Sequence, residues 1–342
     1  MKPRTFAMFV APSLALMLLF IALPLVSVFV QSFYSTQPVY ETTEVEACTP
    51  GFLAPTCVKE MRSRQKLDAD GKPVMVTKFV GLDAYRTLLA PDAVAAAFAA
   101  GGGGLAAVLH IDFYAALRFT LSFTLITLPL VVGLGLVIAV ALNSVTRSLR
   151  GPLIFASLLP FIVTPVIGAL SIRWLFIGDG VLTAALRWVL DSNISMFAQG
   201  WTIELLMLTY RVWHVAPFAF VVFYAGLQTV DLDTLESAIV DGASRLERLR
   251  FVIIPHLMPL ITFISLIHLM DSYRVFEEVV GFSSQAHRIS LQWLTFSFLT
   301  PDETGSRAIT RASASSMLTM VGIVLLLIPL LMRTWRDHRV KR

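Results

Sequence analysis

The sequence is poor in charge and in the signatures of soluble enzymes. Asp, Glu, Lys and Arg make up 15% of the 342 residues, and hydrophobic residues make up 56%. A soluble domain has about a quarter charged residues. There is no Walker A sequence, no His-Glu-x-x-His, no Gly-x-Ser-x-Gly and no Cys-x-x-Cys. Gly101–Gly104 is not followed by Gly-Lys-Ser/Thr, so we do not expect this chain to hydrolyse a nucleotide through a P-loop.

Apolar residues are instead gathered in blocks long enough to cross a bilayer, which takes about 20 residues of helix. The six blocks are Phe6–Phe33, Phe119–Leu142, Leu153–Phe176, Trp201–Gln228, Leu260–Gly281 and Ala312–Met332. The first is too long for the core of a signal peptide and lacks an Ala-x-Ala cleavage site, so we expect it to be an uncleaved span. The sequence therefore predicts an all-α integral membrane protein with six transmembrane helices.

Basic residues are clustered at alternate ends of these blocks. The clusters are Lys2 and Arg4; Arg147 and Arg150; Arg245, Arg248 and Arg250; and Arg333, Arg336, Arg339, Lys341 and Arg342. The positive-inside rule places all of them, and both termini, in the cytoplasm. The net charge of +4 then reflects contact with a lipid bilayer, and we expect no nucleic-acid partner.

The segment between the first two spans, residues 34–118, is too long for a simple connection and lies outside the cytoplasm in this topology. It carries both cysteines, Cys48 and Cys57. Two cysteines on one exported segment favour a disulfide. Two free thiols are the alternative, and a metal site is not expected because no histidine lies nearby.

A polar segment at residues 229–259 separates the fourth and fifth spans and reads as a helix-turn-helix. Asp233 and Glu236 can form a capping box at its start. Ala238 and Ala243 keep one face small, and Gly242 permits a bend between two short helices. We expect Pro255 and Pro259 to end the second helix. These features predict a docking element.

The segment resembles the cytoplasmic coupling loop of permease subunits of ABC importers. That loop reads Glu-Ala-Ala, three residues, Gly, nine residues, then Ile-x-Leu-Pro. Here the pattern is Glu236-Ser237-Ala238, Gly242, then Val252-x-Ile254-Pro255. The resemblance implies a type I importer permease fold whose coupling helix docks on an ATPase. The implied coupling residues are Glu236, Ala238, Asp241, Gly242, Ala243 and Pro255.

Other stretches resemble the carbohydrate-uptake branch of this family. They are Ala11–Leu14, Phe79–Tyr85, Pro160–Ile167 and Arg173–Phe176. The sequence departs from the branch at Val280–Gln285, where Leu-Thr-x-Gly-Gly-Pro is common, and at Arg118, where asparagine is common. The branch implies a sugar or sugar-like solute: a monosaccharide, oligosaccharide, polyol or glycoside.

The resemblance also implies partners and a location. The partners are a second permease subunit, commonly a different chain, two ATPase subunits and an extracytoplasmic solute-binding protein. ATP and magnesium would be bound by the ATPase subunits, so we expect no cofactor and no metal in this chain. The location is the bacterial inner membrane.

The fifth apolar block is interrupted by polar residues, which are His268, Asp271, Tyr273, Arg274, Glu277 and Glu278. Counted from Pro259, Asp271 lies ~18 Å into a helix, near the midplane. A lone charge there costs about 2.5–3.5 kcal/mol. Asp271, Arg274 and Glu278 have i, i+3, i+7 spacing, which predicts one shared face. That face is either an ion-pair ladder that fixes helix register or the polar lining of a solute pathway.

The fourth block contributes Tyr210, Trp213 and His214 to the same candidate pathway, since aromatic faces stack on sugar C–H groups. An alternative for Tyr210, Arg211 and Trp213 is an interfacial aromatic belt with a snorkelling arginine.

These features divide the chain into five parts: 1–33, tail and first span; 34–118, outer segment; 119–228, second to fourth spans; 229–259, coupling loop; 260–342, last two spans and basic tail. A secondary transporter or channel for a polar solute is the alternative function, but it would need inverted repeats, which we do not find. A membrane-embedded enzyme that uses His268 and Asp271 is a second alternative.

Overall fold

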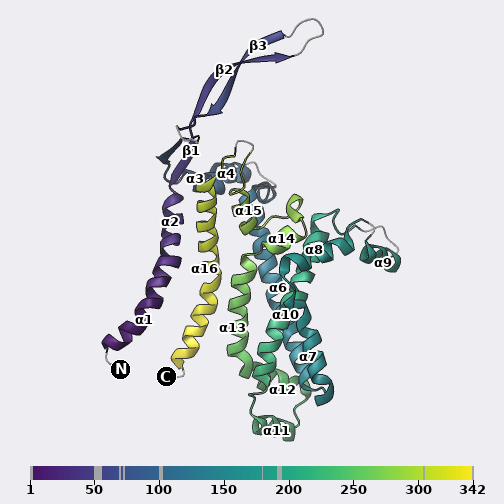
Figure 1. The fold of residues 1–342 in the computed structure, drawn as a ribbon. Coiled ribbons are helices and arrows are strands. Elements are labelled where there is room, and N and C mark those ends of the chain that lie inside the picture. The colour runs from purple at the N-terminus through teal and green to yellow at the C-terminus, as the bar shows by residue number, and fades with distance from the viewer. Residues whose placement is uncertain are drawn as a thin grey trace. The chain divides into compact units, whose positions relative to one another are not determined.

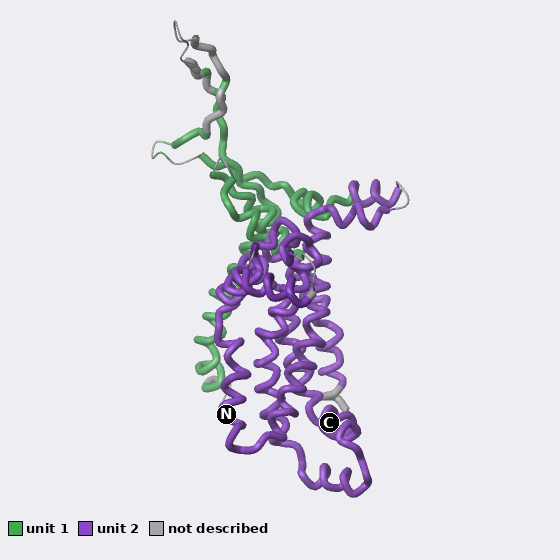
Figure 2. The backbone as a smooth tube through the Cα atoms, turned by 90° about the vertical axis from the view of Figure 1, so that its right-hand side faces the viewer, with its two compact units in different colours: residues 1–91, 295–318 green, residues 92–294, 319–342 purple. Residues whose placement is uncertain are grey.

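A computed structural model describes residues 3–49, 56–68, 71, 74–99, 103–178, 180–190, 195–302 and 305–340. Most of these residues are helical (Figure 1). The chain forms two compact units, Met1–Pro91 with Thr295–Leu318, and Asp92–Leu294 with Thr319–Arg342 (Figure 2).

The first unit begins with one long apolar helix. It consists of α1 (Pro3–Met17), a π-helical turn η1 (Leu18–Ala22) and α2 (Leu23–Gln31). Thr5–Gln31 is long and apolar enough to cross a membrane, as predicted. The π-turn ends two residues before Pro24, and such wider turns accommodate a proline without ending the helix.

The outer segment contains strands, which the sequence analysis did not predict. Strand β1 (Tyr34–Pro38) pairs antiparallel with β4 (Met75–Phe79), and β2 (Tyr40–Thr49) pairs antiparallel with β3 (Thr56–Gln65). The Thr and Val residues of β2 suit a strand. Cys48 lies directly opposite Cys57 in this register. The side chains of both cysteines are outside the described residues, so the disulfide stays a prediction.

Helix α3 (Asp83–Leu89) follows β4 and packs within the first unit. Ala84 and Leu88 form a small buried cluster with Ala314. The Tyr85 hydroxyl donates a hydrogen bond to Ser32 Oγ at 2.8 Å, so α3 is tied to the end of α2. This helix begins within Phe79–Tyr85, one of the stretches that resemble the carbohydrate-uptake branch.

The second unit is built mainly from helices, and α4, α15 and α16 each lie partly in the first unit. Its elements are α4 (Pro91–Ala99), α5 (Gly104–Val108), α6 (Asp112–Asn143), α7 (Arg147–Ile162), α8 (Pro165–Phe176), α9 (Val181–Leu190), α10 (Gly200–Leu227), α11 (Leu232–Val240), α12 (Arg245–Arg248), η2 (Leu249–Ile253), α13 (Ile254–Tyr273), α14 (Glu277–Gly281), η3 (Ser284–Ala286), α15 (Leu291–Ser297) and α16 (Ile309–Val340).

Helices α6 and α10 lie side by side and form the centre of this unit. Gly135 of α6 makes the approach possible, because a Cβ there would lie 2.6 Å from Ala219 Cβ and 2.9 Å from Phe220 N. Buried side chains of α6, α10 and α13 fill the space around this contact, including Val131, Phe223 and Leu257. Burying such a side chain contributes about 1.5–3 kcal/mol.

The predicted third span is broken. Helices α7 and α8 meet at 92°, so the described residues contain five helices long and apolar enough to cross a membrane, or up to six if this pair counts as one span. Thr164 is extended (φ −63°, ψ 138°) directly before Pro165. A proline disfavours helical geometry in the residue before it, which explains the break.

The fifth span also differs from the prediction. Pro255 and Pro259 do not end a helix: α12 runs through the π-turn η2 into α13, with Pro255 in the first turn of α13 and Pro259 inside it. At its other end α13 stops at Tyr273, eight residues before the predicted Gly281. Phe276 (φ −141°, ψ −47°) separates it from α14, so the chain turns where one helix was expected.

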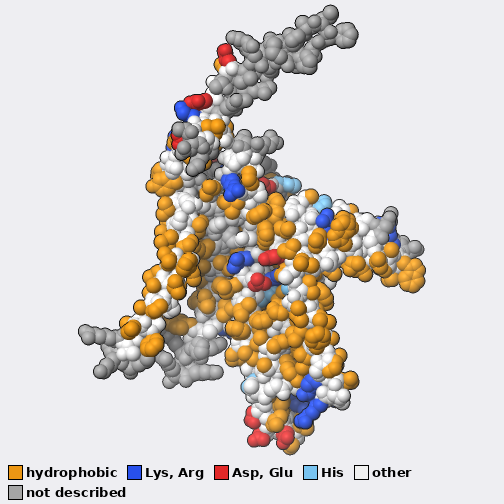
Figure 3. Space-filling view, viewed as in Figure 1, with side chains coloured by type: hydrophobic (Ala, Val, Ile, Leu, Met, Phe, Trp, Pro, Cys, Tyr) orange, Lys and Arg blue, Asp and Glu red, His pale blue; other side chains and the backbone are white. Residues whose placement is uncertain are grey.

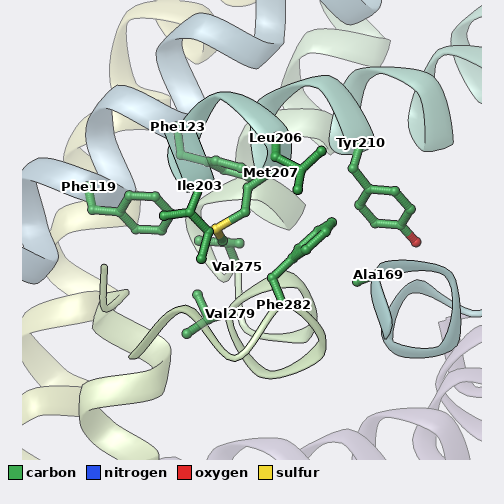
Figure 4. Close-up of a cluster of buried hydrophobic side chains, with 10 residues drawn as sticks. All are labelled: Phe119, Phe123, Ala169, Ile203, Leu206, Met207, Tyr210, Val275, Val279 and Phe282. Carbon is green, nitrogen blue, oxygen red and sulfur yellow. The ribbon is translucent and has the colours of Figure 1, made fainter. Parts of the chain in front are cut away.

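The turn after α13 is held by a buried cluster (Figure 4). Val275, Val279 and Phe282 pack there against side chains of α6 and α10, among them Phe119 and Met207. The backbone N–H of Leu291 also donates to Thr120 Oγ1 of α6 at 3.1 Å. The segment between α13 and α15 is therefore an integral part of the core.

Candidate functional site

Arg211 of α10 is the centre of a buried charge cluster. Its Nη1 donates to Glu278 Oε1 of α14 at 2.8 Å, and its Nη2 donates to Asp271 Oδ2 of α13. The Arg211 side chain is 4% exposed and that of Glu278 is 0% exposed, whereas Asp271 is 64% exposed. One cation thus bridges two carboxylates from two elements.

This arrangement corrects the predicted ladder of Asp271, Arg274 and Glu278. The three cannot share one helical face, because α13 ends at Tyr273. Arg274 is exposed, and the cation between the two carboxylates is Arg211. Asp271 lies in the last turn of α13, two residues before the helix ends.

A cavity of about 390 Å³ opens beside this cluster, between α6, α10, α13 and the α7–α8 bend. Its lining includes Arg211, His214, His268, Asp271 and Glu277. Apolar side chains complete the wall, namely Val131, Phe161, Pro165, Val215, Phe218, Ile264 and Ile267. Figure 3 shows acidic and basic side chains gathered near α14 on an otherwise largely hydrophobic face.

The two histidines of the cavity are bound differently. His214 Nε2 lies 2.8 Å from the carbonyl oxygen of Val163, to which it donates, so it braces the extended break between α7 and α8. His268 Nε2 lies 2.9 Å from Thr127 Oγ1 and 2.9 Å from Ser272 Oγ. These contacts do not join His268 to Asp271, whose carboxylate binds Arg211, so the geometry gives no support to an acid–base pair.

The other predicted pathway residues lie outside the cavity lining. Tyr210 is buried and donates to the Pro165 carbonyl at 2.8 Å, with its ring 5.5 Å from those of His214 and Phe282. Tyr273 is buried where α13 meets Gly322 of α16. Trp213 is 48% exposed. Tyr210 therefore supports the cavity wall, and neither Tyr273 nor Trp213 faces the space.

Buried polar atoms without a hydrogen-bond partner surround the cavity. Within the described ranges they include Arg211 Nε, His214 Nδ1, His268 Nδ1 and Glu278 Oε2. Each such group costs about 1–3 kcal/mol when left unpaired. Their concentration at one place in an apolar helical unit marks the cavity as a candidate functional site.

A second ion pair was not predicted. Arg288 Nε donates to Glu204 Oε2 at 2.6 Å, and Ser122 Oγ donates to Glu204 Oε1 at 3.3 Å. The pair ties the turn after α14 to α10 and α6. Glu204 is the single acidic residue of the apolar block Trp201–Gln228. This isolated charge was the feature of the sequence that could have indicated an ion pair.

The predicted docking element forms two short helices beyond the ends of α10 and α13 (Figure 1). Asp231, not Asp233, caps α11: its side chain accepts from Asp233 N at 3.3 Å and from Thr234 Oγ1 at 2.7 Å. The Thr234 hydrogen bond lowers the pKa of the Asp231 carboxyl. The predicted capping box of Asp233 and Glu236 is therefore wrong.

Gly242 ends α11 with a left-handed backbone, φ +81°. In this turn the Ala243 N–H donates to the Ala238 carbonyl at 2.9 Å. A capping box does form one step later, where Ser244 N donates to Glu247 Oε2 at 2.7 Å and Glu247 N donates to Ser244 Oγ at 3.3 Å. Hydrogen bonding from Ser244 lowers the pKa of the Glu247 carboxyl.

Most of the predicted coupling residues lie in α11 or in the turn between α11 and α12. Glu236, Asp241 and Gly242 are exposed, and Ala238 and Ala243 are half-buried. Pro255 lies in the first turn of α13, outside the two short helices. Large apolar side chains are also exposed here, namely Leu232, Ile239, Val240, Leu246 and Phe251.

No family model matches the chain. A probable ABC transporter permease protein of Pyrococcus horikoshii is 30% identical over 212 residues, covering 59% of this chain and 68% of that protein. The chain belongs to the ABC transporter permease proteins. The predicted family is thus confirmed, and it is a family of transport permeases and not of secondary transporters or channels.

Other relatives of this permease have names that specify sugar transport. An arabinooligosaccharides transport system permease protein of Halalkalibacterium halodurans is 26% identical over 173 residues, 50% of this chain and 55% of that protein. A trehalose/maltose transport system permease protein of Thermococcus litoralis is 26% identical over 217 residues, 61% of this chain and 70% of that protein. The permease thus spans between about half and seven tenths of the length of these relatives.

The fold matches a solved structure over almost the whole chain. That structure is a bacterial ABC transporter involved in the import of the acidic polysaccharide alginate, and a chain of it matches with a TM-score of 0.62 at 18% identity. The match covers 99% of this permease and 96% of that chain. The predicted importer permease fold is confirmed.

Proposed function

We propose that this permease forms half of the translocation pathway of an ATP-driven importer for a sugar or sugar-like solute. The cavity beside Arg211 carries this proposal. Carboxylates and imidazoles bind hydroxyl groups, and Phe161 and Phe218, stacked with ring centroids 6.0 Å apart, supply an apolar surface for sugar C–H groups. The names of the sugar-transporting relatives support the same class.

The charges around the cavity favour an uncharged solute. Asp271 and Glu277 line it, and the buried Glu278 shares the single Arg211 guanidinium with Asp271. Among the described lining residues, the cation Arg211 is therefore already paired with two carboxylates, which disfavours an acidic sugar. A monosaccharide, oligosaccharide, polyol or glycoside without acidic groups fits this balance.

We infer that α11 and the turn at Gly242 dock on an ATPase subunit. Five large apolar side chains are exposed on and beside these short helices, beyond the ends of α10 and α13, which supports a protein partner. Figure 3 shows acidic side chains gathered over α11, which suits polar contacts from Glu236 and Asp241. Closure of two ATPase subunits on ATP would then move α10 and α13.

The remaining partners follow from the family. They are a second permease subunit of a different sequence, and an extracytoplasmic solute-binding protein. A periplasmic protein loaded with an alginate pentasaccharide is bound to the related alginate transporter. ATP and magnesium would be held by the ATPase subunits. The basic residues at Arg147, Arg150, Arg245 and Arg248 support a multi-pass inner-membrane protein with both termini in the cytoplasm.

The test is to purify the assembly through a tag on this permease, identify the co-purifying chains, and measure ATP-dependent uptake in proteoliposomes of the solute held by the binding protein. Gly242→Trp should abolish uptake, because a side chain at φ +81° is strained and would protrude from the docking surface. Gly151→Trp is the matched control, since Gly151 is a helical glycine at which an added Cβ would meet no other atom within 4 Å. Normal uptake by Gly242→Trp, or purification without an ATPase subunit, would overturn the proposal.

A further inference from the structure

Helix α9 shows an apolar face that its own unit does not cover. Val181, Ala184, Ala185 and Trp188 have i, i+3, i+4, i+7 spacing and are all exposed. Trp188 is 86% exposed and Val181 is 73% exposed. The opposite side faces the protein, because Thr183 is 1% exposed and donates to the Phe176 carbonyl of α8 at 2.7 Å.

The direction of α9 narrows the choice of what covers this face. The chain bends by 92° between α7 and α8, and α9 continues across the direction of α6 and α10 (Figure 1). Figure 3 shows hydrophobic side chains along the lower side of α9, the side toward the level of the spanning helices. Whatever covers this apolar face must therefore lie on the same side of α9 as the membrane-spanning helices.

We propose that α9 lies flat at the membrane surface with Trp188 among the lipid headgroups. Amphipathic helices of this kind bury their apolar face about 5–10 Å into the headgroup and acyl boundary. Tryptophan prefers this depth because its ring is apolar and its N–H needs a polar partner. A lipid surface is favoured over a protein partner because the apolar surface continues along α8, where Ile167, Leu170 and Trp174 are also exposed.

The proposal assigns α9 a role that spanning helices cannot have. By holding α8 and the α7–α8 break at the level of the headgroups, it fixes one wall of the cavity, since Pro165 and Phe161 line that wall. Which leaflet it occupies rests on the orientation proposed above, whereas the lipid contact itself does not.

Spin labels test this in the assembled complex in lipid nanodiscs. Trp188→Cys, Val181→Cys and Val189→Cys place labels on or beside the apolar face, and Leu186→Cys places one on the opposite, half-buried side. The native Cys48 and Cys57 are replaced by serine. We expect the ratio of oxygen to nickel-chelate collision rates to be several-fold higher at positions 181, 188 and 189 than at an exposed label replacing Asp302.

Each alternative has a distinct outcome. A high nickel-chelate collision rate at positions 188 and 189 would show a face in water, and low rates for both reagents would show a face covered by protein; either result overturns the proposal. If Trp188→Cys does not assemble, positions 181 and 189 decide. If the assembly shows no uptake while these labels report contact with lipid, the proposed transport function is contradicted but the position of α9 at the membrane surface is not.

Discussion

The Arg211 guanidinium lies 2.8 Å from Glu278 Oε1, and both side chains are buried from solvent within the second unit. Two opposite charges in such a place stabilise the fold only as a pair, because either one alone is left unsolvated. The contact joins α10 to α14 across the turn that follows α13.

Arg211→Met should therefore destabilise the permease strongly. It leaves Glu278 and Asp271 without their shared cation, and breaking a buried pair costs about 3–5 kcal/mol. Thermal unfolding of the detergent-purified complex measures the loss. Arg274→Met, which removes an exposed arginine from the same turn, is the control and should leave the unfolding temperature nearly unchanged. Equal effects of the two would refute the assignment of Arg211 as the bridging cation.

Asp271→Asn should reduce uptake while the complex still assembles. Asp271 is 64% exposed and lines the cavity, so its loss affects solute binding more than packing. We expect uptake to fall about tenfold, which corresponds to about 1.4 kcal/mol. Asp92→Asn, an exposed acidic residue on α4, is the control for loss of one negative charge. Loss of assembly would instead favour the structural ion-pair alternative.

The Glu204–Arg288 pair should contribute measurably to stability. Its side chains are 14% and 24% exposed, so Arg288→Ala leaves Glu204 poorly solvated and should cost about 1–3 kcal/mol. A double-mutant cycle with Glu204→Ala isolates the pairwise energy. The Lys66–Glu41 pair is the comparison, since its side chains are 49% and 54% exposed and such surface pairs give about 0–1 kcal/mol. No coupling between Glu204 and Arg288 would contradict this.

Cys48 and Cys57 should resist alkylation until the protein is reduced. Opposite residues of an antiparallel pair have Cα atoms about 4.5–5.5 Å apart, within the range a disulfide spans, about 4.4–6.8 Å. Mass spectrometry of alkylated protein should show no label without reductant and two labels with it. In Cys57→Ser, Cys48 should react at once. Two labels without reductant on freshly prepared protein would mean free thiols.

The helical content of the fold could be predicted because a bilayer sets the length of an apolar helix. Gly242 was also predictable, since the bend it makes needs a left-handed residue. The π-turns before Pro24 and Pro255 could not be predicted from the sequence, because in water-exposed sequence a proline normally signals the end of a helix. The paired strands β2 and β3 were missed because largely polar strands carry no strong apolar alternation.

The candidate site was predictable in residue types but not in pairing. Polar residues within an apolar block marked Asp271, Glu278 and His268. Their partners depend on where α13 ends, and that end is set by packing of Val275 and Phe282 in the core. Arg211 belongs to a different block, so no spacing along the chain could join it to Asp271.

The close approach at Gly135 restricts how the permease can change its access. With Ala219 and the Phe220 backbone directly against Gly135, α6 cannot slide past α10 without the two helices separating. We therefore expect the two helices to move together. Alternation that opens the cavity to one side and then the other would then change the position of the α6–α10 pair relative to α13.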